Sequence, residues 1–208
     1  MNNVCKICFK DIKDYSLYNL VNKKHILCEE CFGKLKAKFY KLNIGTVKAT
    51  AIYDYSDVIK ELIFKYKGCY DYELKDVFLY RYLNYLKLKY RNYYVVPVPS
   101  FHVDDEKRGF NHVIEIYKLL NLKMLTIIHK NKAHKQSENS GRQRHDIRSV
   151  LEIDKNIDMK GKKILLVDDI MTTGSTLLSC VELLKSVHAK HIEILVIAKT
   201  KRKSKTEY

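Results

Sequence analysis

The sequence lacks any hydrophobic run that approaches the roughly 20 consecutive apolar residues a membrane span requires. Its first ten residues, MNNVCKICFK, also lack the apolar core of a signal peptide. Hydrophobic residues make up 46% of the chain and charged residues 30%, so the composition does not indicate wholesale disorder. We therefore expect a cytoplasmic protein whose 208 residues form one α/β domain with a buried core, plus a small appendage.

A disulfide framework is not expected either, because a reducing compartment favours metal binding by the six cysteines. Two C-x-x-C pairs lie near the N-terminus, separated by nineteen residues. Two thiolates of one tight turn can reach a single ion, so two such pairs predict a closed, structural Zn²⁺ site. The predicted ligands are Cys5, Cys8, Cys28 and Cys31. His25 is a conceivable substitute ligand, although a lone exposed histidine is the preferred interpretation, and Cys69 and Cys180 are predicted to be small apolar fillers.

Acidic residues are too few to balance the basic ones: 24 Asp and Glu face 39 Lys and Arg, for a formal net charge of +15. Residues 1–48 contribute +6 and the last ten residues +4, so two thirds of the excess lies at the two ends. Such an exterior favours a polyanion such as nucleic acid, because binding releases counterions. Solubility alone would also explain it, and the tail 201–208 is either a solubilising end or an arm that contacts DNA.

Strand and helix patterns alternate from residue 49 to residue 200. Residues 48–55 predict a strand, and residues 56–68 predict a helix that begins at Ser56 or Asp57 and stops at Gly68. Further strands are predicted at 93–100, 124–130, 149–153, 162–169 and 191–200, with helices at 109–122 and 175–188. This alternation predicts an α/β fold with a mostly parallel sheet and helices on both faces. The expected domains are a zinc module (1–48), the α/β domain (49–200) and a basic tail (201–208).

Two segments stand apart from this alternation. Residues 70–94 contain eight tyrosines with Lys and Arg between them; a helix here would bury one tyrosine face, and only the remaining rings could stack on bases. Residues 129–148 show no periodicity and carry six Lys or Arg against two acids. They predict a long basic loop, which is uncommon inside a compact domain and often functional.

The stretch ILLVDDIMTTGSTL, residues 164–177, carries the strongest chemical signal. Asp168 and Asp169 follow a strand buried on both faces, and Ser175 begins the next helix, at the end of the sheet where ligands of open α/β sheets bind. Gly174 lets successive N–H groups converge, and the helix N-terminus favours a phosphate. The two carboxylates would repel that phosphate, so they must face hydroxyls or a divalent cation. The predicted ribose-phosphate site is Asp168, Asp169, Thr172, Thr173, Gly174, Ser175 and Thr176.

Two other interpretations of this stretch fit less well. A receiver domain also opens with LLVDD, but it needs far more than the 39 residues that follow Asp169. A P-loop needs the pattern G-x-x-x-x-G-K-[ST], and no Lys follows Gly174 at that spacing.

The segment VDDIMTTGST resembles the ribose-phosphate motif of type I phosphoribosyltransferases. Residues 96–112, VPVPSFHVDDEKRGFNH, resemble a motif of the ComF family, with His112 where Gln is usual. Residues 65–68, KYKG, resemble that family's first phosphate loop, and the paired C-x-x-C module is similar too. Residues 134–151 resemble its mobile loop: Gln136 and Arg144 match, whereas Asp146, Ser149 and Leu151 depart from the pattern.

This resemblance implies a type I phosphoribosyltransferase-like fold and a role in natural transformation, the import of single-stranded DNA, with a helicase-like ATPase as partner. It also implies a position at the inner face of the membrane, through the uptake machinery. An enzyme of this kind would use phosphoribosyl diphosphate with Mg²⁺ and would displace diphosphate from C1 of the ribose. The implied diphosphate contacts are Lys65, Lys67, Gly68, Arg108 and Arg144.

Three hypotheses follow from the residues and the resemblance together. The chain is a module that binds single-stranded DNA, an active phosphoribosyltransferase, or an adaptor whose zinc module binds a partner ATPase. The first and third are compatible, and we favour them together, with catalysis as the alternative.

Overall fold

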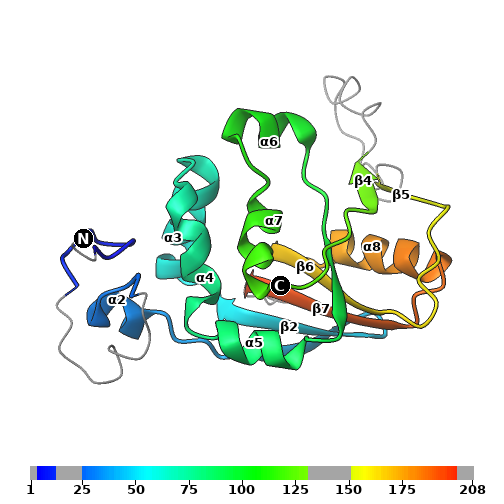
Figure 1. Cartoon of the computed structure of the whole chain (residues 1–208), viewed down its shortest axis with the longest axis horizontal. Helices are drawn as coiled ribbons and strands as arrows, with labels where there is room; N and C mark the ends of the chain where they lie inside the picture. The colour runs from blue at the N-terminus through cyan, green and yellow to red at the C-terminus, as the bar shows by residue number, and fades with distance from the viewer. Residues whose placement is uncertain (1–3, 13–24, 131–150, 201–208) are drawn as a thin grey trace, which may run out of the picture.

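The computed structural model describes residues 4–12, 25–130 and 151–200, and a five-stranded sheet forms its centre (Figure 1). The strand order is β1-β2-β7-β6-β3. The bounds are β1 Tyr40–Ile44, β2 Val47–Asp54, β3 Tyr93–Pro97, β6 Lys163–Met171 and β7 His191–Lys199. The strands β2, β7, β6 and β3 run parallel, and β1 is an antiparallel edge strand. The expected mostly parallel sheet is therefore confirmed.

The two central strands, β6 and β7, are buried on both faces, which explains their continuous apolar sequences. Ile164 and Leu166 face one core, whereas Leu165 and Val167 face the other. A strand covered on both sides has no solvent face and therefore shows no polar alternation.

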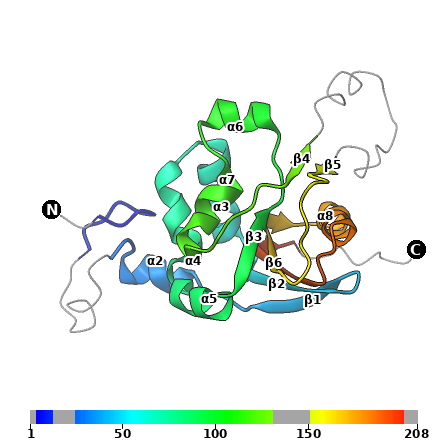
Figure 2. The ribbon, with the colours of Figure 1, turned by 45° about the vertical axis from the view of Figure 1, so that its right-hand side comes forward.

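Helices cover both faces of the sheet, as the two ribbon views show (Figures 1 and 2). One core cluster joins the sheet to α3 (Asp57–Gly68), α4 (Val77–Tyr80), α5 (Leu83–Lys89) and α7 (His112–Tyr117). The other joins it to α8 (Ser175–Ser186) and to a small hairpin of β4 (Ile128–Lys130) and β5 (Leu151–Ile153). The predicted helices at 56–68 and 175–188 correspond to α3, with Ser56 as its N-cap, and to α8.

Among the described residues, the strands predicted at 124–130 and 149–153 add no further strand to the main sheet. Met124 forms an isolated parallel bridge with Val95 of β3, whereas Ile128–Lys130 and Leu151–Ile153 pair antiparallel with each other. Their buried residues Ile128 and Leu151 pack into the core under α8, so the hairpin covers a face of the sheet. The predicted basic loop begins at this hairpin, and its residues 131–150 lie outside the described part of the chain, as does the tail 201–208.

The helix predicted at 109–122 is shorter in the structure, where it consists of α7 and the 3-10 turn η2 (Lys118–Leu120). A separate helix that was not predicted, α6 (His102–Arg108), precedes it and has Gly109, with a φ of +78°, as its C-cap. Glycine adopts this left-handed conformation at little cost and so ends the first helix.

The tyrosine-rich segment 70–94 is also not one helix. It consists of the 3-10 turn η1 (Tyr72–Asp76), α4 and α5. Tyr90 is fully buried, and the exposed rings are Tyr70, Tyr72 and Tyr85. None of the described helices is long and apolar enough to cross a bilayer.

The N-terminal module packs against η1 and α4. The Nζ atom of Lys6 lies 2.7 Å from a carboxylate oxygen of Glu73 and also pairs with Asp76. The guanidinium of Arg81 lies 4.4 Å from the centre of the Phe32 ring and donates to the Phe32 carbonyl. The main sheet begins at Tyr40, before the expected domain boundary at residue 48, because β1 pairs with β2.

Tyr117 ties α7 to the two central strands. Its side chain is fully buried, and its hydroxyl lies 3.0 Å from the carbonyl oxygens of both Asp168 and Leu195. Replacing Tyr117 by Phe should lower the free energy of unfolding by about 1 to 3 kcal/mol, because the two carbonyl oxygens would lose a donor inside the core. Urea denaturation of the purified variants would measure the change.

Tyr85→Phe is the matched control, because Tyr85 is 51% exposed. It should change the free energy of unfolding by less than about 0.5 kcal/mol. Equal losses in the two variants would contradict the role assigned to the Tyr117 hydroxyl.

Candidate functional site

The loop between β6 and α8 has the geometry of an anion-binding turn. Gly174 adopts a φ of +83° and is the N-cap of α8, a helix of 12 residues. Thr172, Thr173 and Ser175 are exposed, and the Thr173 and Ser175 hydroxyl oxygens lie 3.0 Å apart. The predicted hydroxyls and the amino end of the helix therefore occur together in one exposed turn, where an incoming phosphate would meet N–H and O–H donors.

The two acidic residues lie in β6 just before this turn, in different environments. Asp169 is 6% exposed, and its Oδ2 atom lies 2.9 Å from Lys67 Nζ and 3.2 Å from His112 Nε2. Its Oδ1 atom accepts from the backbone N–H of Ile170 at 2.7 Å. Asp168 is partly buried, and its Oδ1 accepts from the N–H of Asp169 at 2.9 Å. Asp169 is thus fixed by the chain's own donors.

These environments separate the pKa values of the two carboxyls. Burial and the adjacent charge of Asp169 raise the pKa of Asp168 well above its ordinary range. Burial alone would also raise the pKa of Asp169, but His112 and Lys67 outweigh it and hold that pKa below its ordinary range. Asp169 is therefore the ionised member of the pair.

A hollow of about 240 Å³ lies in front of the two acids. It is surrounded by the end of α3, the loop after β3, the segment of α6 and α7, the ends of β4 and β6, and the start of α8. Its lining residues are Lys67, Val98, Pro99, Ser100, Phe101, Asp104, Arg108, His112, Val113, Lys130, Asp168, Asp169 and Thr176. Three basic side chains, Lys67, Arg108 and Lys130, and three carboxyls, Asp104, Asp168 and Asp169, thus surround a space large enough for part of a sugar phosphate.

Some of the expected diphosphate contacts line the hollow and others do not. Lys67 and Arg108 line it. Lys65 does not, because its position two residues earlier on α3 turns it elsewhere, and its Nζ pairs with Glu61 at 2.7 Å. Gly68 is exposed at the end of α3, and Arg144 lies outside the described residues, as does Gln136.

Lys130 is a lining residue that the sequence analysis did not single out. Its Nζ lies 3.9 Å from the centre of the Phe101 ring. Burial lowers the pKa of Lys130, and the nearby Asp168 opposes that shift. The available signal was its position at the end of the predicted strand 124–130, the edge of the fold where ligands bind.

A larger hollow, of about 550 Å³, adjoins the first and shares Lys130 and the segment 98–101 with it. Its acidic lining residues already have partners: Asp105 binds Arg108 at 3.0 Å, and Glu106 binds His102 at 3.1 Å. The smaller hollow, which contains Asp168 and Asp169, therefore has the clearer chemistry.

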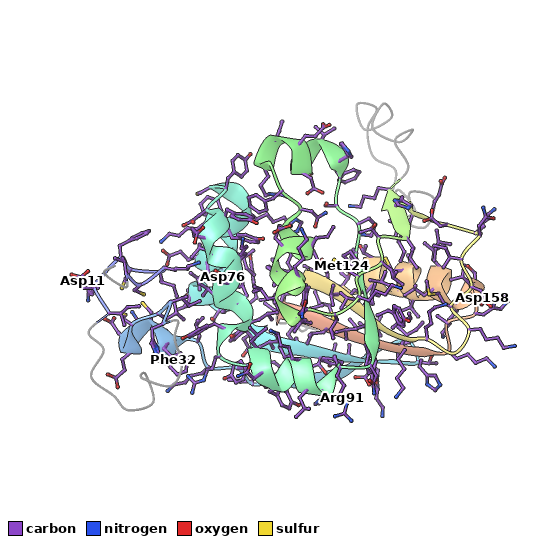
Figure 3. The ribbon with its side chains drawn as sticks, viewed as in Figure 1. Asp11, Phe32, Asp76, Arg91, Met124 and Asp158 are labelled. Atoms are coloured by element: carbon purple, nitrogen blue, oxygen red, sulfur yellow. The ribbon has the colours of Figure 1, made fainter. Side chains whose placement is uncertain are left out.

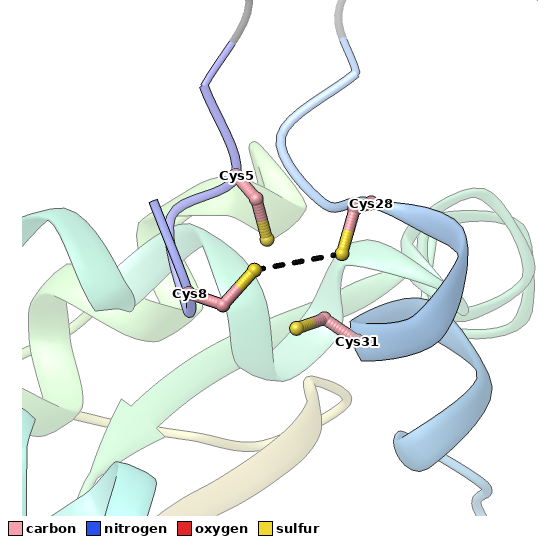
Figure 4. A group of neighbouring side chains, drawn as sticks. All are labelled: Cys5, Cys8, Cys28 and Cys31. Atoms are coloured by element: carbon pink, nitrogen blue, oxygen red, sulfur yellow. Dashed lines mark hydrogen bonds between the residues drawn. The ribbon is translucent and has the colours of Figure 1, made fainter. Parts of the chain in front are cut away.

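The four cysteines of the N-terminal module converge (Figure 4). Cys5 and Cys8 come from one turn, Cys28 is the N-cap of α2 (Glu29–Lys34), and Cys31 lies in that helix. All four Sγ atoms lie within 4.8 Å of one another, and those of Cys8 and Cys28 are 3.6 Å apart. A tetrahedral ion with bonds of about 2.3 Å requires sulfur atoms separated by roughly 3.8 Å, so this donor set could hold a metal such as zinc.

The backbone around this cluster favours thiolate at one position. Burial opposes ionisation of Cys5, but backbone N–H groups, led by that of Cys28, lower its pKa to about 7. His25 is not a member of the cluster formed by the described residues. Cys180 is fully buried, as expected, whereas the prediction for Cys69 is wrong: it is exposed because it follows the end of α3.

The chain is similar to known proteins with phosphoribosyl transferase domains and to a competence protein. Residues 106–208 match the family model of the phosphoribosyl transferase domain. The chain is 29% identical over 166 residues to the Competence protein ComFC of Streptococcus pneumoniae, covering 80% of this chain and 72% of that protein. A stretch of 37 residues, 18% of this chain and 13% of the relative, is 46% identical to the ribose-phosphate pyrophosphokinase of Pyrococcus furiosus.

Among solved structures, the chain is similar to the adenine phosphoribosyltransferase of Saccharomyces cerevisiae, with 16% identity, a TM-score of 0.40, and coverage of 82% of this chain and 88% of that one. It is also similar to a hypoxanthine phosphoribosyltransferase of Staphylococcus aureus, with 18% identity, a TM-score of 0.40, and coverage of 64% and 67%.

Gly174→Ala tests the anion-binding turn. A Cβ atom at this position would lie 2.7 Å from Ile44 Cδ1, and the left-handed φ adds strain of about 1 to 2 kcal/mol. Urea denaturation should therefore show a loss of stability larger than that of Gly161→Ala, where φ is +75° but no atom lies within 4 Å of the added Cβ. Adding Ile44→Val, which removes Cδ1, should recover part of the difference. Equal losses for the two glycine variants would contradict the close approach.

Cys8→Ser tests the metal cluster. Elemental analysis should show about one zinc ion per chain in the parent protein, and much less in this variant, because a four-thiolate shell loses a ligand. The melting temperature should fall by at least about 5 °C, since the bound ion stabilises the module. Cys69→Ser, at an exposed cysteine outside the cluster, should leave both quantities unchanged. A parent protein without bound metal would refute the assignment.

Proposed function

We propose that the chain is a phosphoribosyltransferase-like protein of the ComF family that binds a ribose phosphate and single-stranded DNA as a competence factor. The observation that carries the proposal is the hollow in which Asp168 and Asp169 face Lys67, Arg108 and Lys130. The competence role also rests on the similarity to the Streptococcus pneumoniae protein.

The hollow and the turn at 172–176, of which Thr176 lines the hollow, together offer groups for each part of a phosphoribosyl diphosphate. The 5-phosphate would accept from the N–H and hydroxyl donors of the turn at 172–176. The ribose hydroxyls would bind the Asp168 and Asp169 carboxyls, and the diphosphate would bind Lys67, Arg108 and Lys130. Mg²⁺, arriving with the ligand, would neutralise diphosphate charge while keeping water and ligand oxygens as most of its shell.

Catalysis is the alternative function, and the same residues favour it. In a transfer reaction the C1–O bond to diphosphate breaks, a bond from C1 to an acceptor forms, and diphosphate leaves. Cations beside the leaving group stabilise the developing negative charge, and the carboxyls hold the ribose in position. Release of diphosphate from phosphoribosyl diphosphate, and its loss in Asp169→Ala, would establish this activity.

A second surface supports the DNA part of the proposal. At the amino ends of the parallel strands, Lys163 on β6 pairs with Tyr93 on β3 and lies beside its ring, at 5.9 Å. Burial lowers the pKa of Lys89, and the nearby Lys41 lowers it further, whereas Glu193 opposes the shift. We call Lys41, Lys89, Arg91 and Lys163, together with the exposed Tyr85, the basic edge. Figure 3 shows Arg91 at this margin of the sheet, below α5.

The basic edge combines cations and an exposed aromatic ring, the two kinds of group through which proteins bind single-stranded nucleic acid without sequence preference. In the described residues none of its four cations pairs with a carboxylate, whereas Lys10 and Lys34 both pair with Glu30. Unpaired cations can neutralise phosphates, and the ring of Tyr85 offers a stacking surface. The partner ATPase would bind the zinc module, where Phe9 is 72% exposed.

The two proposed ligands bind at opposite ends of the sheet. Lys163 and Asp168 are five residues apart along β6, which corresponds to about 16 Å. Calorimetric titration with phosphoribosyl diphosphate and Mg²⁺, followed by an oligo-dT strand, should therefore show independent binding. Asp168→Asn should weaken the sugar phosphate about tenfold and leave DNA affinity unchanged.

Arg91→Ala combined with Lys163→Ala should weaken DNA binding only. The slope of log affinity against log salt should fall by about 0.7 for each phosphate that the variant no longer neutralises. Lys10→Ala combined with Lys34→Ala removes the same charge from paired positions and is the matched control. Competition between DNA and the sugar phosphate would instead place DNA in the hollow, and absence of sugar-phosphate binding would refute the ribose-phosphate site.

A further inference from the structure

His112 occupies a fixed position behind the two acids. It is the first residue of α7, it is 5% exposed, and its ring lines the hollow. Its carbonyl oxygen accepts from the Tyr66 hydroxyl at 2.9 Å, and Tyr66 is itself buried on α3. Asn111 is the N-cap of α7, and its side chain accepts from the N–H of Ile114. The backbone that carries the ring is therefore held from both sides.

Both nitrogen atoms of the ring have partners of known hydrogen-bonding character. Nε2 lies 3.2 Å from Asp169 Oδ2, and Nδ1 lies 3.2 Å from Arg108 Nη1. A guanidinium can only donate, so Nδ1 accepts; an ionised carboxylate can only accept, so Nε2 donates. The neutral tautomer with its proton on Nε2 satisfies both contacts.

The groups on either side of the ring belong to a closed loop of hydrogen bonds. Arg108 Nε donates to the carbonyl oxygen of Lys67 at 3.1 Å, and Lys67 Nζ reaches Asp169 at 2.9 Å. Arg108 is further held by Asp105, which also accepts from Asn111 at 2.8 Å. His112 completes this loop by contacting both Arg108 and Asp169. It therefore connects the residue proposed to bind diphosphate with the residue proposed to bind the ribose.

We propose that His112 is a positioning residue that holds Asp169 and Arg108 in register for the ribose and the diphosphate. Lys67 and His112 share Oδ2 of Asp169, so a diphosphate that attracts Lys67 would remove one of the two side-chain donors from this atom. The ring then keeps the carboxylate oriented toward the ribose hydroxyls. This inference rests on the proposed ribose-phosphate site and assigns to it a residue that need not touch the ligand.

Two substitutions distinguish a bridge from a space-filling residue. Gln carries one donor and one acceptor, so His112→Gln can contact both partners, whereas His112→Leu fills the space and contacts neither through hydrogen bonds. Calorimetry with ribose 5-phosphate and, separately, inorganic diphosphate should show His112→Gln within about threefold of the parent protein. His112→Leu should bind ribose 5-phosphate about tenfold more weakly, the effect of removing one hydrogen bond to a charged group.

Melting temperatures identify any variant that fails to fold, and affinities are compared for folded protein only. If folded His112→Leu binds both ligands like the parent, the inference is overturned while the ribose-phosphate site stands. If His112→Gln loses binding as Leu does, the bridge is also overturned.

A ligand-free measurement separates this inference from the proposed function. Long-range ¹⁵N–¹H NMR spectra at neutral pH, with the His112 signals assigned by their absence in His112→Gln, should show a proton on Nε2 and none on Nδ1. A proton on Nδ1 overturns the inference, whether or not the parent protein binds a sugar phosphate. Failure of the parent to bind either ligand refutes the proposed function alone.

Discussion

The site depends on one buried negative charge, the carboxylate of Asp169. A carboxylate removed from water is costly unless hydrogen bonds and opposite charges replace the lost hydration. Here the replacement comes from three separate parts of the fold: Lys67 at the end of α3, His112 at the start of α7 and the backbone of β6 itself. The requirement to compensate this charge therefore constrains how the two helices sit on the carboxyl edge of the sheet.

The same constraint explains why the pKa values of the adjacent Asp168 and Asp169 differ. With Asp169 ionised and held, its negative charge and the surrounding burial keep the pKa of Asp168 high. Asp168 is therefore the less acidic member of the pair, while Asp169 holds Lys67 in place beside it. The cations of the hollow are tied to acids or packed on a ring, unlike the cations of the basic edge, which have no acidic partners among the described residues. In the proposed function, positive charge would thus serve a compact phosphate ligand at one end of the strands and an extended polyanion at the other.

Much of the fold followed from local patterns. The double-sided burial of β6 and β7, helices α3 and α8, and the convergence of four cysteines could all be predicted, because periodicity and ligand spacing are local properties. Pairing partners could not be predicted in the same way. The run at 124–130 had the composition of a strand, yet Met124 forms only a single bridge to Val95 of β3, and the last three residues pair with β5 outside the main sheet. The residues of β1 fell within the expected zinc module because nothing in them shows that β2 is their partner.

The turn around Gly174 and the two acids after a buried strand were determined by the sequence itself, since a sharp turn, a helix start and a strand end all depend on neighbouring residues. The partners of those acids were decided only by the tertiary structure. Lys65 and Lys67 look alike in the sequence, but the rotation of α3 turns only Lys67 toward Asp169. His112 and Lys130 reach the hollow from segments distant in the chain, because contacts between remote segments depend on how helices and strands pack, which no local pattern encodes.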